Sequence, residues 1–135
     1  MAIINHKCEF RVPYYDTDKM GIVYHTNYIK YFEIGRTELL RSKGMAYQHI
    51  EEMGYYLPLL AANAEYIQSA LYDDIITIET EVDSNFPVRF TFFYKIFRNE
   101  TLLCTGSTKH CFMHIESMKP SRPPKFFLDF VNTLS

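Results

Sequence analysis

Two aspartates, Asp16 and Asp18, lie in a polar, aromatic loop directly before a helical pattern that begins at Thr26 or Asn27. The first backbone N–H groups of a helix have no partner within it. Together with the helix dipole, they form a site for an oxyanion or a polarised carbonyl. Asp18 is near enough in sequence to reach a group held there, and its carboxylate could act as a nucleophile or activate water. These are the parts that acyl transfer needs.

Each of these residues also has a simpler interpretation. Asp18 could cap a turn or the helix, because aspartate favours both places. Asp16 is expected to be structural and to accept hydrogen bonds from loop N–H groups. We expect no metal at this pair, because no third ligand is nearby in the sequence. His25 could be an ordinary residue of the helix start, or its imidazole could protonate a leaving thiolate.

The helix that must position this loop is predicted from about residue 26 to Gly44, which is a natural stop. Glu33 with Arg36, and Glu38 with Arg41, are expected to be ion pairs on its solvent-exposed face. Apolar residues recur at spacings of three and four and form one stripe: Tyr28, Tyr31, Phe32, Gly35, Leu39 and Leu40. Glycine in a helix interior costs about 1 kcal/mol relative to alanine. The place of Gly35 on the stripe therefore predicts that helix and sheet approach closely there.

In the rest of the chain apolar and polar residues alternate, as is typical of strands. Short helices are expected near 46–53 and 125–134. The predicted strands are 5–12, a long or broken strand from 55 to 68, then 76–83, 88–96 and 102–115. A sheet with one helix on one face is an α+β arrangement. One helix cannot cover a broad sheet, and the uncovered parts are rich in Phe and Tyr. We therefore expect an oligomer.

Composition narrows the class of protein. The 135 residues fit one domain, 1–135, and the formal net charge of -2 argues against a nucleic-acid binder. We expect no signal peptide and no membrane span. The three cysteines fit reduced thiols in the cytoplasm, with Cys104 a small buried hydrophobe. On a strand His110 and His114 would lie about 13 Å apart, too far to share a metal ion.

The segment from Tyr15 to Tyr28 resembles the 4-hydroxybenzoyl-CoA thioesterase family of hotdog proteins, most of all the bacterial acyl-CoA thioesterase branch associated with the Tol-Pal system. The match spans nearly the whole chain. It comprises Tyr15, Asp16-Thr17-Asp18, Gly21, Val23-Tyr24-His25, Asn27-Tyr28, Tyr31-Phe32-Glu33, Arg36-Thr37-Glu38, Glu65-Tyr66, Asp73-Asp74, Ile78-Glu79-Thr80 and Lys119-Pro120.

The resemblance implies a five- or six-stranded antiparallel sheet wrapped around one long helix. It also implies a homodimer, often paired into a homotetramer, with active sites at the dimer interface. Asp18 would be the catalytic carboxylate, and the backbone N–H of His25 would polarise the thioester carbonyl. The branch that acts on aromatic substrates has tyrosine in place of His25, which favours aliphatic or other acyl groups here. No cofactor is implied.

Further residues are expected to bind the substrate. Gly21 and Val23 would shape the loop beside Tyr24, and Ser84 with Asn85 would line the pantetheine channel. Basic side chains suit the phosphates of coenzyme A, and the candidates are Arg89, Lys109, Lys119 and Arg122. The carrier could be coenzyme A or acyl carrier protein. The alternatives are a binding module without catalysis, and a hotdog dehydratase, whose usual His-containing helix motif is not found in this sequence.

Overall fold

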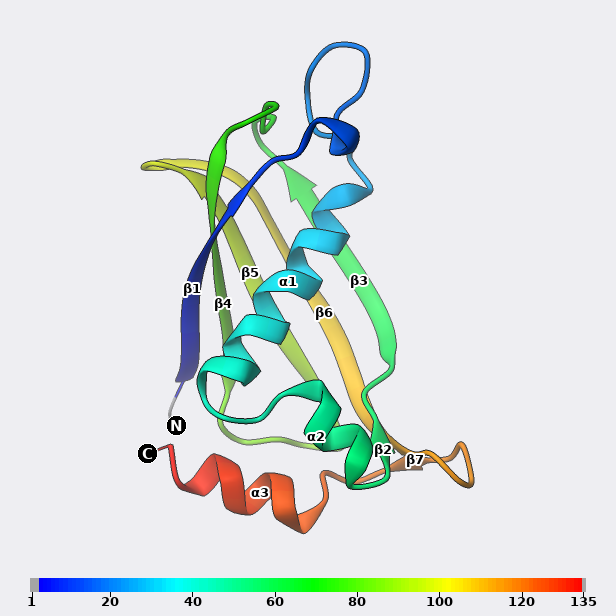
Figure 1. Ribbon diagram of the computed structural model, residues 1–135. Coiled ribbons are helices and arrows are strands. Elements are labelled where there is room, and N and C mark those ends of the chain that lie inside the picture. Colours follow the sequence, from blue (N-terminus) through cyan, green and yellow to red (C-terminus); the bar gives the residue numbers. More distant parts are fainter. Residues whose placement is uncertain (1–2, 135) are drawn as a thin grey trace.

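The computed structural model describes residues 3–134 as one antiparallel sheet with a long helix against its concave face (Figure 1). The strands are β1 (Ile3–Arg11), β2 (Tyr55–Tyr56), β3 (Leu59–Tyr66), β4 (Ile75–Asp83), β5 (Arg89–Arg98), β6 (Thr101–His114) and β7 (Pro120–Ser121). The helices are α1 (Asn27–Ser42), α2 (Tyr47–Glu52) and α3 (Lys125–Asn132), with a single 3-10 turn at Tyr14–Asp16.

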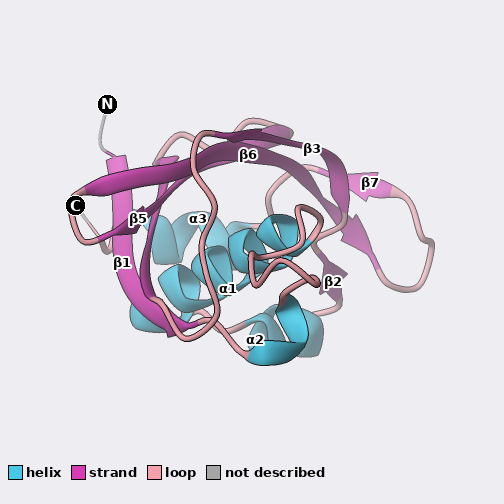
Figure 2. Ribbon diagram, turned by 90° about the horizontal axis from the view of Figure 1, so that it is seen from above, coloured by secondary structure: helices cyan, strands magenta, loops and turns pink. Residues whose placement is uncertain are grey.

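The order of the main strands is β1-β4-β5-β6, and β3 pairs with β6 at the opposite edge from β1. The two-residue strands β2 and β7 also pair with β6, which brings the total to seven instead of the five or six expected. The sheet curves around α1 when it is viewed down the helix (Figure 2). This is the α+β hotdog arrangement that the sequence predicted.

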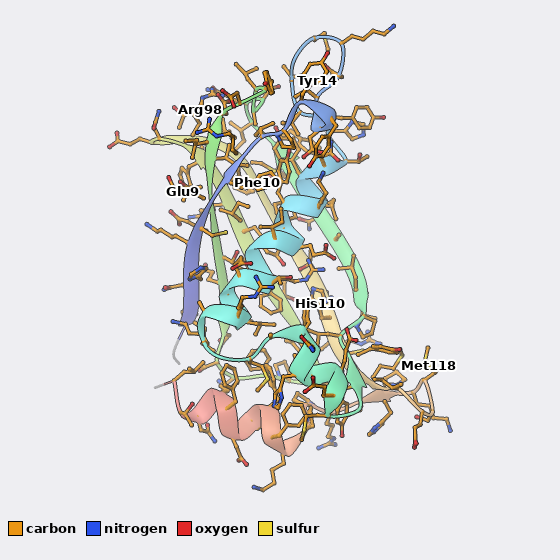
Figure 3. The ribbon with its side chains drawn as sticks, viewed as in Figure 1. Glu9, Phe10, Tyr14, Arg98, His110 and Met118 are labelled. Carbon is orange, nitrogen blue, oxygen red and sulfur yellow. The ribbon has the colours of Figure 1, made fainter. Side chains whose placement is uncertain are left out.

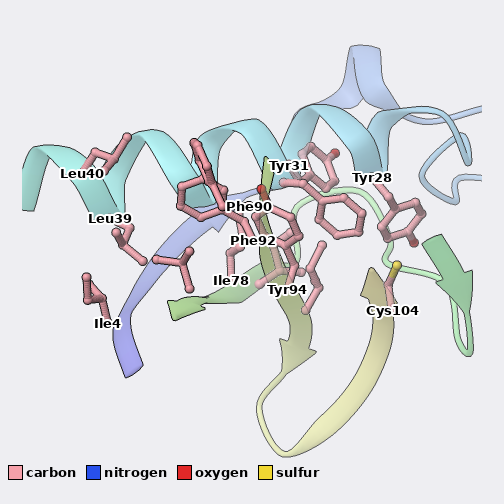
Figure 4. Packing of buried hydrophobic residues seen from close by; sticks show 14 of the residues in the cluster. Ile4, Tyr28, Tyr31, Leu39, Leu40, Ile78, Phe90, Phe92, Tyr94 and Cys104 are labelled. Atoms are coloured by element: carbon pink, nitrogen blue, oxygen red, sulfur yellow. The ribbon is translucent and has the colours of Figure 1, made fainter. Parts of the chain in front are cut away.

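The apolar stripe of α1 makes the core. Tyr28, Tyr31, Phe32, Leu39 and Leu40 are buried against residues of the sheet such as Ile78, Phe90, Phe92 and Tyr94 (Figure 4). The rings of Phe32 and Tyr94 are stacked with their centroids 4.5 Å apart. A Cβ on Gly35 would lie 2.4 Å from Thr80 Oγ1 and 2.7 Å from Ile78 Cγ2. The predicted close approach of helix and sheet at Gly35 is therefore confirmed.

α1 begins at the predicted place, and one of its polar side chains differs from the prediction. The N-cap residue is Thr26, whose side chain makes no capping hydrogen bond. The exposed pair Glu38–Arg41 forms as expected. The predicted pair Glu33–Arg36 also forms, with 3.7 Å between Arg36 Nη2 and Glu33 Oε1, but Arg36 is wrongly predicted to be exposed, because its side chain is buried. Arg36 follows Gly35 on the side of the helix that faces the sheet, which places a guanidinium within the core.

A buried polar cluster surrounds this point. The Tyr94 hydroxyl lies 2.5 Å from Thr108 Oγ1, and His110 Nε2 lies 2.9 Å from the same oxygen. His110 Nδ1 is 3.2 Å from the carbonyl oxygen of Pro58, so this ring nitrogen donates. His110, labelled in Figure 3, belongs to the second half of β6. Burial, and next to it the charge of Arg36, lower the pKa of His110 to about 4. His110 is thus a neutral core residue.

The β3 edge and the cysteines complete the description. Most of β3 is exposed, including Leu59, Leu60 and Tyr66. Cys104 and Cys111 are buried and Cys8 is half-buried, and all of them are free thiols. Burial raises the pKa of Cys104 to about 12. No helix within residues 3–134 is long and apolar enough to cross a membrane.

Candidate active site

A closed loop holds Asp18 between β1 and α1. The backbone N–H of Asp18 donates to the carbonyl of Ile22 at 2.9 Å, and that of Gly21 donates to the carbonyl of Asp18 at 3.0 Å. Gly21 has φ +79°, a left-handed conformation that glycine adopts readily. An isolated bridge between Thr17 and Val23 closes the base of the loop. The predicted role of Gly21 in shaping the loop fits this geometry.

Only one oxygen of the half-buried Asp18 carboxylate accepts a hydrogen bond from the described residues. Its Oδ1 accepts a hydrogen bond from the backbone N–H of Met20 at 2.8 Å, which fixes the side chain. Its Oδ2 accepts none from any residue in the range 3–134. The capping role and the chemical role considered for Asp18 are therefore compatible, because one oxygen orients the group while the other stays available.

Asp16 is held differently, although it is only two residues away. Its carboxylate is 2% exposed, and it accepts from the Tyr31 hydroxyl at 2.8 Å and from the Lys30 ammonium. Burial and this hydrogen bond raise the pKa of Tyr31. The Asp16 carbonyl accepts from the Asn27 side chain at 2.8 Å and from the Tyr24 N–H at 2.9 Å. Asp16 ties the loop to α1 and is structural as predicted, but the predicted partners are wrong: its carboxylate accepts from two side chains of α1 and not from loop N–H groups.

The start of α1 leaves backbone donors open. The N–H of Tyr24 is bonded to Asp16, and the N–H of Asn27 donates to the carbonyl of Tyr24 at 2.9 Å. Between them, the N–H groups of His25 and Thr26 have no acceptor in the described part of the chain. Two adjacent open donors at a helix N-terminus can hold a carbonyl or carboxylate oxygen.

Asp18 and the helix start line the same cavity, which has a volume of 420 Å³. In Figure 1 the loop and the start of α1 lie beside the end of β3. The walls come from all three elements and comprise Asp18, Ile22, Val23, Tyr24, His25, Tyr28, Tyr66, Ile67, Gln68 and Ser69. Two predicted substrate-binding residues, Val23 and Tyr24, are therefore brought together with both predicted catalytic residues.

Tyr66 is a member of the cavity wall to which sequence reasoning gave no role. Its hydroxyl donates to the carbonyl of His25 at 3.1 Å, and its ring meets the rings of His25 and Tyr28 edge-on, with centroids 6.1 and 5.3 Å away. The Tyr28 hydroxyl in turn accepts from the N–H of Ala70 at 3.0 Å. Tyr66 lies far from the loop in the sequence, so no local pattern could have revealed this contact.

The other predicted substrate-binding residues lie elsewhere in this chain. Ser84, Asn85 and Arg89 line a different cavity of 790 Å³ beside α3. Ser84 and Asn85 follow the end of β4 that pairs with Ile3, and Arg89 begins β5, whereas the Asp18 loop follows the other end of β1. Their predicted contact with the substrate can therefore be made only at an active site shared with a second copy of the chain.

The remaining candidates are spread over the surface. Glu65 is exposed and borders another cavity over the sheet, not the one that holds Asp18. Lys109, Lys119 and Arg122 are exposed as well. Within residues 3–134, no group of three His, Cys, Asp or Glu side chains is arranged to hold a metal ion.

Comparison with known proteins gives a consistent set of relatives. Residues 12–131 match the model of the thioesterase-like superfamily. The chain is 33% identical over 118 residues to the acyl-CoA thioesterase YbgC of Haemophilus influenzae, covering 85% of each protein. Its structure is similar to that of the DHNA-CoA thioesterase from Staphylococcus aureus, with a TM-score of 0.88, 30% identity, and coverage of 96% of this chain and 88% of that one.

A more distant solved structure shares the fold. This is the 4-hydroxybenzoyl CoA thioesterase from Pseudomonas sp. strain CBS-3, with a TM-score of 0.81 and 21% identity. The alignment covers 93% of this chain and 98% of that one. At this level of identity the likeness concerns the arrangement of the sheet and the central helix.

Proposed function

The chain belongs to the thioesterase-like superfamily, and from this membership we propose that it hydrolyses acyl-CoA thioesters to a free acid and coenzyme A. The acyl-CoA thioesterase activity named for the Haemophilus relative supports this reaction, as does the CoA thioesterase named for the Staphylococcus structure. The observation that carries the proposal is the cavity lined by both Asp18, whose Oδ2 accepts no hydrogen bond from the described residues, and His25, whose backbone N–H is open at the start of α1.

The chemistry follows from this geometry. The thioester oxygen accepts hydrogen bonds from the N–H groups of His25 and Thr26, which stabilise the negative charge that develops there. Asp18 either attacks the carbonyl carbon to form an anhydride that water then opens, or takes a proton from the water that attacks. In both routes the C–S bond breaks and the sulfur leaves as a thiolate.

The side chain of His25 has a place in the same step. It is exposed on the cavity wall, with its ring 4.5 Å from that of Tyr24. An imidazolium there protonates the departing thiolate, although a coenzyme A thiolate is a good leaving group without this help. The backbone N–H of His25 therefore contributes more to the rate than its ring.

We propose that a second copy of the chain completes the active site. The exposed β3 edge carries apolar residues such as Leu59 and Leu60, and an exposed edge strand readily pairs with another strand. Antiparallel pairing of β3 with its copy continues the sheet across the dimer. The acyl group then lies between α1 of one protomer and strands of its partner, and Ser84, Asn85 and Arg89 of the partner face the coenzyme A moiety. Pairing of dimers into a homotetramer would follow.

The proposed location is the cytoplasm, where acyl-CoA and acyl carrier protein are both present. The free cysteines support a reducing compartment. Coenzyme A is the proposed carrier, and a panel of acyl-CoA substrates of graded chain length, assayed beside acyl-carrier-protein thioesters, will identify the preferred acyl group and carrier.

Replacing Asp18 by Asn tests the proposed mechanism. The amide keeps the size of the side chain and its Oδ1 acceptor for Met20, so the loop keeps its shape and the melting temperature does not change. Loss of the carboxylate is expected to lower kcat for acyl-CoA hydrolysis by about a thousandfold. Release of coenzyme A, measured with a thiol reagent, gives the rate.

The matched control is Asp129→Asn, which removes an exposed carboxylate on α3 whose ion-pair partner is Lys125. This variant is expected to hydrolyse acyl-CoA at the wild-type rate. If Asp18→Asn is as active as the wild type, Asp18 is not catalytic. If the wild type binds acyl-CoA saturably and releases no thiol, the chain is a binding module and not an enzyme.

A further inference from the structure

Arg36 is a buried cation without a buried anion. Its side chain is 7% exposed. Its Nε donates to the hydroxyl of Tyr47 at 2.9 Å, and its Nη2 lies 3.7 Å from an oxygen of Glu33, whose side chain is 63% exposed. Its Nη1 is buried and has no acceptor in the described residues. The Tyr94 hydroxyl also faces the guanidinium, but it is engaged with Thr108.

This arrangement does not balance the charge of Arg36. Burial of an ionised group is costly unless the group is paired and hydrogen-bonded. An exposed carboxylate such as Glu33 contributes little, because water screens it. Neutral hydroxyls of Tyr47 and Tyr94 do not replace an anion. The guanidinium therefore has an unpaired N–H group and a charge that is opposed only by the exposed carboxylate of Glu33.

A cavity lies beside Arg36, apart from the one that holds Asp18. Its volume is 370 Å³, near the lower end of the range of about 300–1,000 Å³ for small-molecule sites. Its walls are mostly apolar or aromatic, and they consist of Glu33, Arg36, Tyr47, Ile50, Glu51, Tyr55, Tyr56, Leu57, Pro58 and Met113. Glu33 and Glu51 are exposed, so Arg36 is the buried charged group of the wall.

We propose that this cavity is a binding site for a carboxylate carried on a short apolar body. The carboxylate accepts from the guanidinium of Arg36, which presents a planar set of donors suited to that group. The apolar body packs against Ile50, Leu57 and Met113. The bound anion supplies the negative charge that Arg36 lacks among the buried residues of the chain.

Two ligands have this chemistry, and their assignment rests on the proposed function. One is the free acid that hydrolysis releases. The other is the distal carboxylate of an acyl group derived from a dicarboxylic acid. If β3 pairs antiparallel with its copy, the Leu59 end of one strand meets the Tyr66 end of the other. The cavity at Leu57 and Pro58 then adjoins the partner's active-site cavity, within reach of an acyl chain.

Binding of hexanoate, measured by isothermal titration calorimetry, tests the site without any turnover. We expect wild-type protein to bind hexanoate at least tenfold more tightly than hexan-1-ol, which has the same body without the charge. Arg36→Met fills a similar volume without the charge and is expected to weaken hexanoate binding by about ten- to a hundredfold. Arg41→Met, which removes an exposed arginine of the same helix, should bind hexanoate like the wild type.

A second variant keeps the test valid if Arg36→Met fails to fold. Glu33→Gln removes the exposed carboxylate that competes for the guanidinium, and it is expected to strengthen hexanoate binding about two- to threefold. The proposal is overturned if hexanoate binds no better than hexan-1-ol. It is equally overturned if Arg36→Met binds hexanoate as tightly as the wild type, since Nη1 is then satisfied by water or by the protein.

Kinetics identify the source of the carboxylate. If the ligand is the product, hexanoate inhibits hydrolysis of hexanoyl-CoA, and Arg36→Met relieves the inhibition. If it is the distal group of the substrate, the wild type prefers glutaryl-CoA to pentanoyl-CoA by kcat/KM, and Arg36→Met loses this preference at least tenfold. Asp18→Asn should bind hexanoate normally in either case, so failure of the proposed hydrolysis and failure of the carboxylate site remain distinguishable.

Discussion

The start and the middle of α1 use polar groups in opposite ways. At the start, Asp18 and His25 line a cavity, and one oxygen of Asp18 and the backbone N–H of His25 are without partners in the described residues, as is the adjacent N–H of Thr26. On the sheet beside the middle of the helix, Thr108 and His110 of β6 are buried and bonded to each other, to the Tyr94 hydroxyl or to the backbone. Open groups at the surface of a cavity cost little, because water satisfies them until a ligand does. Buried groups must be satisfied within the protein.

The difference separates chemistry from stability along one helix. Changes at the open groups of the helix start should alter the rate and leave unfolding unchanged, while changes in the middle should do the reverse. Asp16 tests this division between rate and stability, because it lies close to the start of α1 but is buried and hydrogen-bonded. Arg36 and Thr80 are the exceptions beside the middle of the helix, since each has a buried polar atom without a partner in the described residues. Arg36 also carries a charge and lines a mostly apolar cavity, and that is why we assign it a ligand.

The largest effect that could break this comparison is expected for Asp16→Asn. The change removes the charge that accepts from Tyr31 and Lys30. Hydrogen bonds to charged groups contribute about 1.5–3 kcal/mol each, and Lys30 is partly exposed, so we expect a loss of about 3 kcal/mol in the free energy of unfolding. Urea denaturation measures it. A variant that unfolds like the wild type but loses activity would place Asp16 with the chemistry.

Gly35→Ala is expected to have the next largest effect. The added Cβ would press on Thr80 and Ile78, at a cost of up to about 3 kcal/mol for overpacking. The higher helix propensity of alanine offsets about 1 kcal/mol of this cost, so the free energy of unfolding should fall by about 2 kcal/mol. Thermal unfolding would report the loss. The kcat of the folded fraction should stay within about twofold of the wild type, and a larger fall would couple the middle of the helix to the catalytic step.

The smallest expected effect is on stability in acid, and it concerns the buried His110 beside the middle of α1. The pKa of His110 is lowered to about 4 in the folded chain, whereas an unfolded chain has about 6.5. Below pH 6.5 the unfolded state binds the extra proton, so stability is present above that pH and falls as the pH drops toward 4. Between pH 7 and 5.5 the expected loss is about 1 kcal/mol.

Urea titrations of the wild type and of His110→Gln at both pH values isolate this contribution. The variant starts less stable, but its free energy of unfolding should fall about 1 kcal/mol less between the two pH values. Equal falls in the two proteins would mean that other groups set the acid sensitivity.

Local patterns predicted most of the fold. The apolar stripe and Gly44 predicted the limits of α1 within two residues of those observed, Asn27–Ser42. This was possible because the residues of a helix that face the core recur at a regular spacing in the sequence. Alternation located β4 and β5 for the same reason. The division of the edge strand into β2 and β3, and the short β7, depend on pairing with β6, which no single strand encodes.

The candidate active site was predictable only where its residues are adjacent in the chain. Asp18, Val23, Tyr24 and His25 share one loop, and the structure brings them to one cavity. Tyr66 reaches that cavity from β3, so its contact depends on tertiary structure. Arg36 was misplaced because a pairing rule for exposed helix faces was applied to a residue beside a buried glycine.

The burial of the thiols has a practical consequence for anyone who follows turnover with a chromogenic disulfide. Such reagents react with thiolates. Cys104 and Cys111 are inaccessible, and burial raises the pKa values of Cys8 and Cys104. The native enzyme should therefore contribute almost no background colour at neutral pH, and a slow rise in absorbance without substrate would report that the chain is unfolding.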